Sequence, residues 1–230
     1  MTTSKLFSAI MVICSLSLIS CVKEPEAIAG VSTQEAEIDQ KIEFASYSTN
    51  ASSTSWDLGD GTIEDGVVEF SHEYEDAGLY TVILIVETED GSKSDKLEFP
   101  IYISNPIDKF IDTYVSTEEW ESGNCGSGSE DFTMTIVPGN SPYVFYLVNF
   151  AGEFDSIQAT VGSSNRYSFQ LNEYNNLKDR SGHMWDIAES EEGSLRSNGL
   201  FIDYKRSDTY TPQSSQGQCG LVVCEIVSPL

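Results

Sequence analysis

The chain has 230 residues, of which 37 are acidic and 12 are basic, so its formal net charge is −25 at pH 7. Such a charge repels nucleic-acid phosphates and anionic lipid head groups, and nucleic-acid binding is therefore not expected. Hydrophobic residues make up 40% and aromatic residues 11% of the chain, enough for real cores, and this length suits two small domains.

The amino-terminal segment has the order of a secretory signal. One positive charge at Lys5 precedes an uncharged, mostly apolar run from Leu6 to Ile19. This run is shorter than a membrane-spanning helix, which needs about 20 residues. The ending Leu18-Ile19-Ser20-Cys21 resembles the lipobox of bacterial lipoproteins. The resemblance implies that residues 1–20 are a signal peptide, cleaved before Cys21, and that the Cys21 thiol is lipidated. An ordinary secreted protein and an uncleaved anchor are the alternatives.

Residues 21–33 are expected to form an acidic tether. Their start, Val22-Lys23-Glu24-Pro25-Glu26, resembles the signal that sends lipoproteins of some diderm bacteria to the outer face of the outer membrane. We therefore expect a lipid-anchored protein of the outer membrane, exposed at the cell surface. A position facing the periplasm remains the alternative.

Residues 34–104 are predicted to form short β-strands. Apolar or alternating runs cover Ile38–Phe44, Gly78–Val86 and Lys96–Ile103. The last two are separated by an Asp90-Gly91 turn, which is typical of a β-hairpin. Tyr80, Val82, Leu84 and Val86 fall on one face of a strand by period two.

Three ordered motifs in this region resemble the PKD (polycystic kidney disease) domain, an immunoglobulin-like β-sandwich. The first is W-D-x-G-D-G, the second H-x-Y and the third G-x-Y-x-V-x-L. The resemblance implies a non-catalytic module that contacts proteins or carbohydrates. The motif residues, expected to be structural, are Trp56, Asp57, Gly59, Asp60, Gly61, His72, Tyr74, Gly78 and Tyr80.

The chemistry of these motif residues agrees with a structural role. Trp56 offers a large apolar body for a thin core. Asp57 and Asp60, with the neighbouring glycines, suit a tight turn stabilised by side-chain-to-backbone hydrogen bonds. Calcium binding by these two aspartates is the functional alternative. His72 is interpreted as a buried structural histidine rather than as a ligand or a base.

The second domain is predicted to span residues 106–230, after a seam at Asn105-Pro106, because proline disfavours strand pairing. Residues 107–114 are predicted to form one helical turn. Eight short β runs follow, which predict an antiparallel meander, closed or nearly closed as a barrel. The layout resembles lipocalin-like domains that follow PKD modules in bacterial surface lipoproteins. The predicted strands are Tyr114–Glu121, Phe132–Val137, Tyr143–Phe150, Ser156–Val161, Arg166–Leu171, His183–Ala188, Ser194–Tyr204 and Leu221–Val227.

Three of the five cysteines remain if Cys14 leaves with the signal and Cys21 is lipidated. Outside the cytoplasm one disulfide is permitted. Cys125 and Cys219 lie in or beside Gly/Ser-rich turns, and we expect them to pair. Cys125–Cys224 is the rival pair. No metal site and no cofactor are predicted, since no histidine stands at ligand spacing to the cysteines.

No catalytic motif stands out, and the chain is predicted not to be an enzyme. His72 and His183 fall in different predicted domains, and no nucleophile elbow is visible. The acidic clusters Glu118/Glu119/Glu121 and Glu189/Glu191/Glu192 are interpreted as solvated strand ends.

Trp120 and Trp185 are the glycan-platform candidates, with core packing as the alternative role. The predicted function is a membrane-anchored module that binds protein or carbohydrate. A glycan-capture lipoprotein of an outer-membrane import system is a first alternative. A small hydrolase with its active site in the carboxy-terminal β domain is a second.

Overall fold

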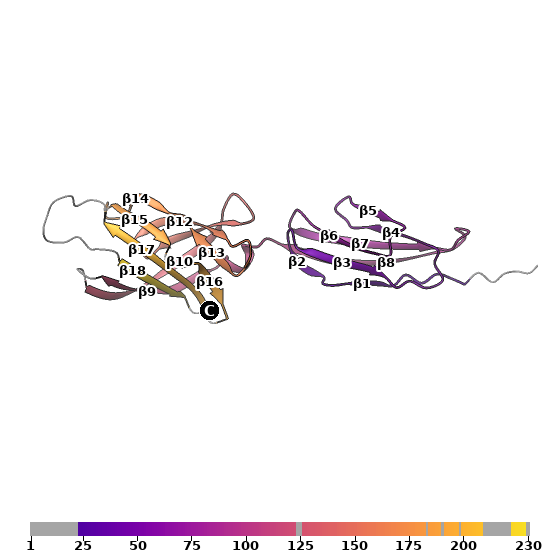
Figure 1. Cartoon of the computed structure of the whole chain (residues 1–230), viewed down its shortest axis with the longest axis horizontal. Helices are drawn as coiled ribbons and strands as arrows, with labels where there is room; N and C mark the ends of the chain where they lie inside the picture. The colour runs from indigo at the N-terminus through magenta and orange to yellow at the C-terminus, as the bar shows by residue number, and fades with distance from the viewer. Residues whose placement is uncertain are drawn as a thin grey trace, which may run out of the picture. The chain divides into compact units, whose positions relative to one another are not determined.

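The computed structural model describes residues 23–122, 126–182, 184–189, 191–197, 199–208 and 222–228. Apart from a short 3-10 turn, η1 (Asp108–Phe110), every helix or strand in these ranges is a β-strand, so the predicted all-β class is confirmed (Figure 1). None of the described residues forms a helix that is long and apolar enough to cross a membrane.

The chain divides into two compact units. One comprises the described residues up to 32 together with 43–70 and 81–99, and the other comprises 33–42, 71–80 and the described residues from 100 onwards. This division cuts through individual strands and does not follow sheet membership. The predicted limits 34–104 and 106–230 therefore stay predictions.

The amino-terminal strands form two sheets of an immunoglobulin-like β-sandwich. The five-stranded sheet includes one parallel pair, β2 with β8. The three-stranded sheet has the order β1 (Ala29–Val31), β3 (Lys41–Ser46), β6 (Glu69–Glu73). The five-stranded sheet has the order β2 (Glu35–Glu37), β8 (Ser94–Ser104), β7 (Gly78–Glu87), β4 (Ser53–Asp57), β5 (Ile63–Asp65).

Aromatic packing around Trp56 forms part of the sandwich core. The Trp56 side chain is fully buried, and its ring lies edge-on to Phe44 and Phe70, with centroid distances of 6.0 and 5.5 Å. Phe44 comes from β3 and Phe70 from β6, whereas Trp56 comes from β4. One indole therefore joins the two sheets, as its large apolar area predicts.

Strand β7 shows the predicted alternation. Val82, Leu84 and Val86 are fully buried, and the residues between them are more exposed. Tyr80, predicted on the same face, is half-buried, and its hydroxyl donates to the Asp76 carbonyl at 2.7 Å. The apolar half of the strand is thus placed in the core by period two, as expected.

The segment predicted as a tether is in part a strand of the sandwich. Glu26 forms a β-bridge with Thr49, and β1 pairs antiparallel with β3. The Ala27 N–H donates to Asp95 Oδ2 at 2.8 Å. Residues 26–31 are therefore held to the domain by backbone bonds, which composition alone did not indicate.

The carboxy-terminal strands form one ten-stranded antiparallel sheet. Strand β18 pairs with both β9 and β17, so hydrogen bonding runs around a closed circuit through β9, β10, β11, β12, β13, β16, β17 and β18. The predicted antiparallel, barrel-like arrangement is confirmed. The strands are β9 (Thr113–Ser122), β10 (Gly126–Pro138), β11 (Val144–Phe150), β12 (Phe154–Val161), β13 (Ser168–Leu171), β14 (Tyr174–Lys178), β15 (Met184–Glu189), β16 (Gly193–Arg196), β17 (Gly199–Asp208) and β18 (Val222–Ser228).

The number of strands differs from the prediction at two places. Strand β14 was not predicted, because its sequence Tyr-Asn-Asn-Leu-Lys is poor in the β-branched and aromatic residues typical of strands. The single strand predicted over Ser194–Tyr204 is two strands, β16 and β17, which form a hairpin. Gly199 at the start of β17 adopts a φ of +148°, a conformation that glycine allows.

The predicted helical turn is present as η1, although it covers only three residues. Ile107, Phe110 and Tyr114 are buried, as the predicted apolar side of the turn requires. The Phe110 ring stacks on Phe145 at 5.3 Å and lies edge-on to Phe169 at 5.6 Å. The turn thus contributes an apolar side chain to the interior of the closed sheet.

Candidate functional site

The interior of the closed sheet contains charged side chains among its apolar ones. On β9 the buried face carries Tyr114, Ser116 and Glu118, and Glu118 is only 2% exposed. On β17 the same alternation buries Tyr204 completely and leaves Arg206 7% exposed. A buried charge is unfavourable unless it is paired, so the partners of these groups decide what the site can do.

Each buried charge has a partner. The Tyr204 hydroxyl donates to Glu118 Oε1. Arg206 Nη1 donates to Glu153 Oε2 at 2.6 Å, and the two side chains are 9% and 39% exposed. The Arg206 guanidinium also lies 4.9 Å from the centroid of the Trp185 ring, within cation–π range.

Two loops complete the cluster. Glu153 lies in the turn between β11 and β12. Asp179 directly follows β14 and accepts a hydrogen bond from Trp185 Nε1 at 2.9 Å. We call this set of six residues the barrel cluster; its members are Glu118, Glu153, Asp179, Trp185, Tyr204 and Arg206.

The electrostatic balance of the barrel cluster is acidic. Three carboxyl groups face one guanidinium, and burial raises the pKa of Glu153 above its usual range. Arg206 acts in the opposite direction, whereas the charges of Glu118 and Asp179 raise that pKa further. Glu153 consequently takes up a proton more readily than an ordinary glutamate, and the acidic site favours neutral or cationic ligands.

One member of the barrel cluster was predicted from the sequence as a binding residue, and the prediction for another was wrong. Trp185 was singled out as a glycan platform, and it is half-buried against the core. Glu118 was interpreted as part of a solvated acidic cluster, which is wrong, because its carboxylate is buried whereas Glu119 is more exposed. The period-two series Tyr114, Ser116, Glu118 was the signal that could have identified the inward face.

Trp120, the other predicted platform, lies on the same face of β9 as Glu118, two residues further along. Its register partner on β10 is Gly128, and a Cβ at Gly128 would lie 2.2 Å from Trp120 Cζ2. The indole therefore occupies space that the glycine leaves open, and it packs against the hydrophobic core. Glycan binding by either tryptophan stays a prediction.

The PKD-type turn is stabilised by its own aspartates. Asp57 Oδ1 accepts the Gly59 N–H, and Asp60 Oδ1 accepts the Thr62 N–H, both at 2.9 Å. Gly59 has a φ of +82°, and a Cβ there would lie 2.8 Å from the Thr81 carbonyl oxygen. These bonds are the expected turn chemistry. Within the described ranges no group of three His, Cys, Asp or Glu residues could hold a metal ion.

His72 is half-buried, and its ring lies edge-on to Tyr74 at a centroid distance of 4.7 Å. Tyr74 is fully buried, and its ring lies 4.4 Å from that of Tyr80. The aromatic residues of the second and third motifs thus pack together. His72 was predicted to be buried and is only half-buried, and its structural role stays a prediction.

Most of the cysteine predictions fall outside the described residues. Cys21, Cys125 and Cys219 lie there, as does His183. Cys224 is described by its backbone, which lies opposite Trp120 on β9 and Tyr204 on β17. Lipidation of Cys21 and both disulfide pairings therefore stay predictions.

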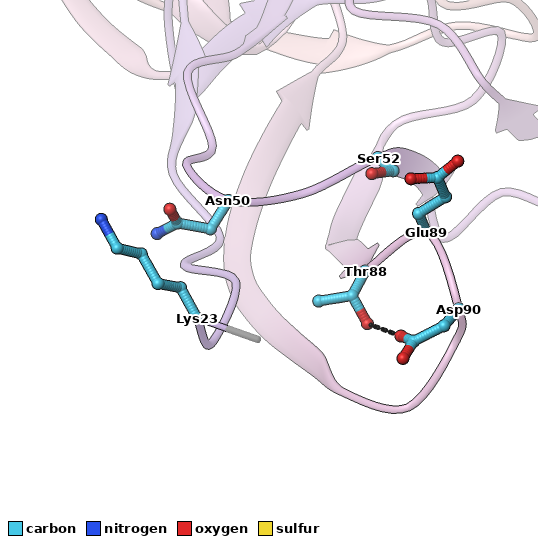
Figure 2. A pocket seen from close by; sticks show the side chains of 6 residues that line it. All are labelled: Lys23, Asn50, Ser52, Thr88, Glu89 and Asp90. Carbon is cyan, nitrogen blue, oxygen red and sulfur yellow. Dashed lines mark hydrogen bonds between the residues drawn. The ribbon is translucent and has the colours of Figure 1, made fainter. Parts of the chain in front are cut away.

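A polar hollow of about 560 Å³ lies in the sandwich beside the Thr88–Asp90 loop (Figure 2). The Thr88 hydroxyl donates to Asp90 Oδ1 at 2.8 Å, and the Ser92 N–H and hydroxyl donate to the same oxygen at 3.1 and 2.8 Å. These bonds, led by that from the Ser92 N–H, lower the pKa of Asp90 to about 2. The carboxylate is thus occupied by its own loop, and the hollow is a weaker candidate than the barrel cluster. The hollow is lined by Lys23, Asn50, Ser52, Thr88, Glu89 and Asp90.

Comparisons with known proteins support the assignment of the amino-terminal part. Residues 22–102 match the family model described as PKD domain. No curated protein matches the chain. One similar solved structure is described as "Structural basis for the promiscuous specificity of the carbohydrate-binding modules from the beta-sandwich super family". It is 11% identical, with 91% of this chain and 93% of that chain covered and a TM-score of 0.35, which is too low to carry a functional inference.

Proposed function

We propose that the protein is a lipid-anchored, non-enzymatic binding protein of the bacterial cell envelope, held at the outer membrane and exposed at the cell surface. The apolar run from Leu6 to Ile19 and the lipobox-like ending at Cys21 support the anchor. The PKD-type sandwich is a module of a kind that contacts proteins or carbohydrates. The carboxy-terminal closed sheet recognises the ligand through the barrel cluster.

The sandwich begins close to the proposed anchor. The Glu24 carbonyl accepts a hydrogen bond from Asn50 Nδ2 at 3.3 Å, and the Glu24 carboxylate lies 3.6 Å from Lys93 Nζ. The three residue-to-residue steps from Cys21 to Glu24 span at most about 11 Å when fully extended. An anchor on Cys21 would therefore hold the sandwich near the membrane surface, without a long flexible tether.

The pairing of buried charges in the barrel cluster carries the proposal of ligand recognition. A buried ion pair contributes little net stability, and apolar residues of similar volume often stabilise a core as well or better. Stability therefore does not account for Glu118, Tyr204 and Arg206 in this interior. Glu153 and Trp185 are partly exposed and connect these groups to solvent. A hydroxylated ligand would donate to the carboxylates and pack on the indole.

Binding of a glycan panel to the full chain tests this function. The protein is purified in a detergent without a sugar head group, and Trp185→Ala and Glu153→Gln are compared with Glu173→Gln, which alters an exposed carboxylate. We expect both cluster variants to weaken binding by about tenfold or more, a loss of about 1.4 kcal/mol, and the control to bind normally. Equal binding by all four proteins would contradict recognition at the cluster.

The anchor is tested separately in cells. Cys21→Ala or treatment with globomycin should leave unprocessed or unlipidated precursor. Protease added to intact cells should digest the mature protein if it lies on the outer face. Normal acylation of the Cys21→Ala protein would contradict the anchor, and complete protection from protease would place the protein on the periplasmic side.

A hydrolase is the second candidate function, because the carboxyl pair Glu118 and Glu153 combines a buried carboxylate with a carboxyl group of raised pKa. Such pairs supply general acids and bases. Turnover of chromogenic glycosides or esters, lost in Glu153→Gln, would favour this function over binding. Binding without turnover at every pH from about 4 to about 8, a span that covers the ordinary titration of carboxyl and imidazole groups, would contradict it.

A further inference from the structure

The outward face of the three-stranded sheet contains a hollow of about 390 Å³ that is separate from the barrel cluster. Phe44 and Ser46 on β3 are buried, so Glu43, Ala45 and Tyr47 point to the opposite, outward side. The outward residues of the neighbouring strands complete the hollow. Those used below are Gly30, Ser32 and Glu69.

The floor of the hollow consists of small residues. Gly30 on β1 lies directly opposite Ala45 on β3, and neither side chain extends more than a methyl group above the sheet. The Ser32 hydroxyl accepts a hydrogen bond from the Glu43 N–H at 3.0 Å, which fixes the end of the β1–β3 pair.

Tyr47 adds an aromatic ring to this hollow. The side chain is 62% exposed, so most of its surface meets solvent. Its N–H donates to the Ile28 carbonyl at 2.8 Å, which positions the residue at the end of the β1–β3 pair. The ring lies against Gly30, since a Cβ at Gly30 would be only 2.6 Å from Tyr47 Cε2. The ring thus covers the Gly30 end of the floor, and its outer surface is open to solvent.

Two carboxylates complete the hollow. Glu43 and Glu69 are exposed and belong to the outward faces of β3 and β6. Carboxylates accept hydrogen bonds from hydroxyl groups. No lysine or arginine is among the residues lining this hollow, so an anionic ligand would meet only repulsion. The chemistry fits a neutral ligand that has an apolar face and several hydroxyl groups.

We infer that this hollow binds a neutral pyranose sugar. The C–H face of the sugar ring packs on the exposed surface of the Tyr47 ring, and its hydroxyl groups donate to Glu43 and Glu69. The site is independent of the barrel cluster, so it would survive substitutions there. A sandwich with such a site would itself bind carbohydrate, in addition to the ligand recognition proposed for the closed sheet.

Calorimetric titration of the full chain with neutral tetrasaccharides of glucose, xylose and mannose tests the inference. The detergent again carries no sugar head group. Tyr47→Ala should weaken binding by about tenfold or more, whereas Tyr47→Phe, which keeps the ring, should retain most of it. Tyr102→Ala is the matched control, because Tyr102 is 52% exposed and lies on β8, outside this hollow.

Gly30→Ala provides a second variant that keeps the tyrosine. The added methyl group would displace the Tyr47 ring and raise the floor, so binding should fall while the circular dichroism spectrum stays unchanged. Glu153→Gln should leave this binding component intact, which separates the two sites. The inference is overturned if no sugar binds, or if Tyr47→Ala binds as well as Tyr102→Ala.

Discussion

Removing the Tyr204 hydroxyl tests how far the buried Glu118 carboxylate depends on that donor. Glu118 is 2% exposed and accepts a hydrogen bond from Tyr204. Hydrogen bonds to charged groups contribute about 1.5–3 kcal/mol, and a buried carboxylate deprived of a donor is strongly destabilising. We therefore expect Tyr204→Phe to lower the free energy of unfolding of the closed sheet by about 2–3 kcal/mol.

Tyr114→Phe is the matched control, because the Tyr114 hydroxyl donates to the neutral Phe110 carbonyl at 2.9 Å. Its loss should be smaller, about 1 kcal/mol. The double variant Glu118→Leu with Tyr204→Phe should recover most of the stability, since both polar partners are then replaced by apolar groups.

Urea unfolding followed by fluorine NMR of fluorotryptophan-labelled protein measures these differences. Trp120 and Trp185 report on the closed sheet, and Trp56 reports on the sandwich. The reasoning is refuted if Tyr204→Phe loses no more stability than Tyr114→Phe, because the carboxylate would then have an adequate partner elsewhere. Loss of the Trp56 signal in the same transition would show that the effect is not confined to the closed sheet.

Three further outcomes are expected. Trp56→Ala should destabilise the sandwich by about 3–5 kcal/mol in urea unfolding, because it empties the core between two sheets. Gly59→Ala should cost more than about 1 kcal/mol in the same assay, since its φ of +82° and its contact with the Thr81 carbonyl exclude a Cβ. The pKa of Asp90 is lowered from 3.8 to about 2 in the folded protein, so its ionised carboxylate stabilises the fold above the unfolded pKa. That stabilisation is lost as the pH falls through about 2. Asp90→Asn should therefore lower the urea midpoint at neutral pH and have no effect below pH 2, whereas an effect that persisted in acid would contradict this assignment.

Local chemistry made the sandwich predictable. The Asp57–Gly59 and Asp60–Thr62 hydrogen bonds join residues two positions apart, so the turn can be predicted from residues that are close together in the sequence. Alternation along β7 similarly places Val82 and Leu84 in the core through period two. The tether prediction departed from the structure because residues 26–31 are held by partners on β3 and near Thr49, which lie beyond such local patterns.

The barrel cluster could not be assembled in the same way. In the sequence Glu118 is one of several neighbouring acidic residues. Only the alternation of buried and exposed residues along β9 distinguishes it from them. Its partner Tyr204 is 86 positions away, and Arg206 and Glu153 are 53 positions apart. The outward hollow beside Tyr47 likewise depends on which residue of β1 lies opposite Ala45, and that register is set by strand pairing.

The amino-acid sequence by itself determined the all-β class, the PKD-type turn and core of the amino-terminal part, and the prediction of an anchor at Cys21, because these depend on neighbouring residues and on composition. Only the tertiary structure decided that β18 closes the sheet against both β9 and β17 and that Glu118, Tyr204 and Arg206 face the interior. The physical reason is that strand order and register are chosen by packing between distant segments, whereas a strand's own sequence specifies only which of its residues share a face.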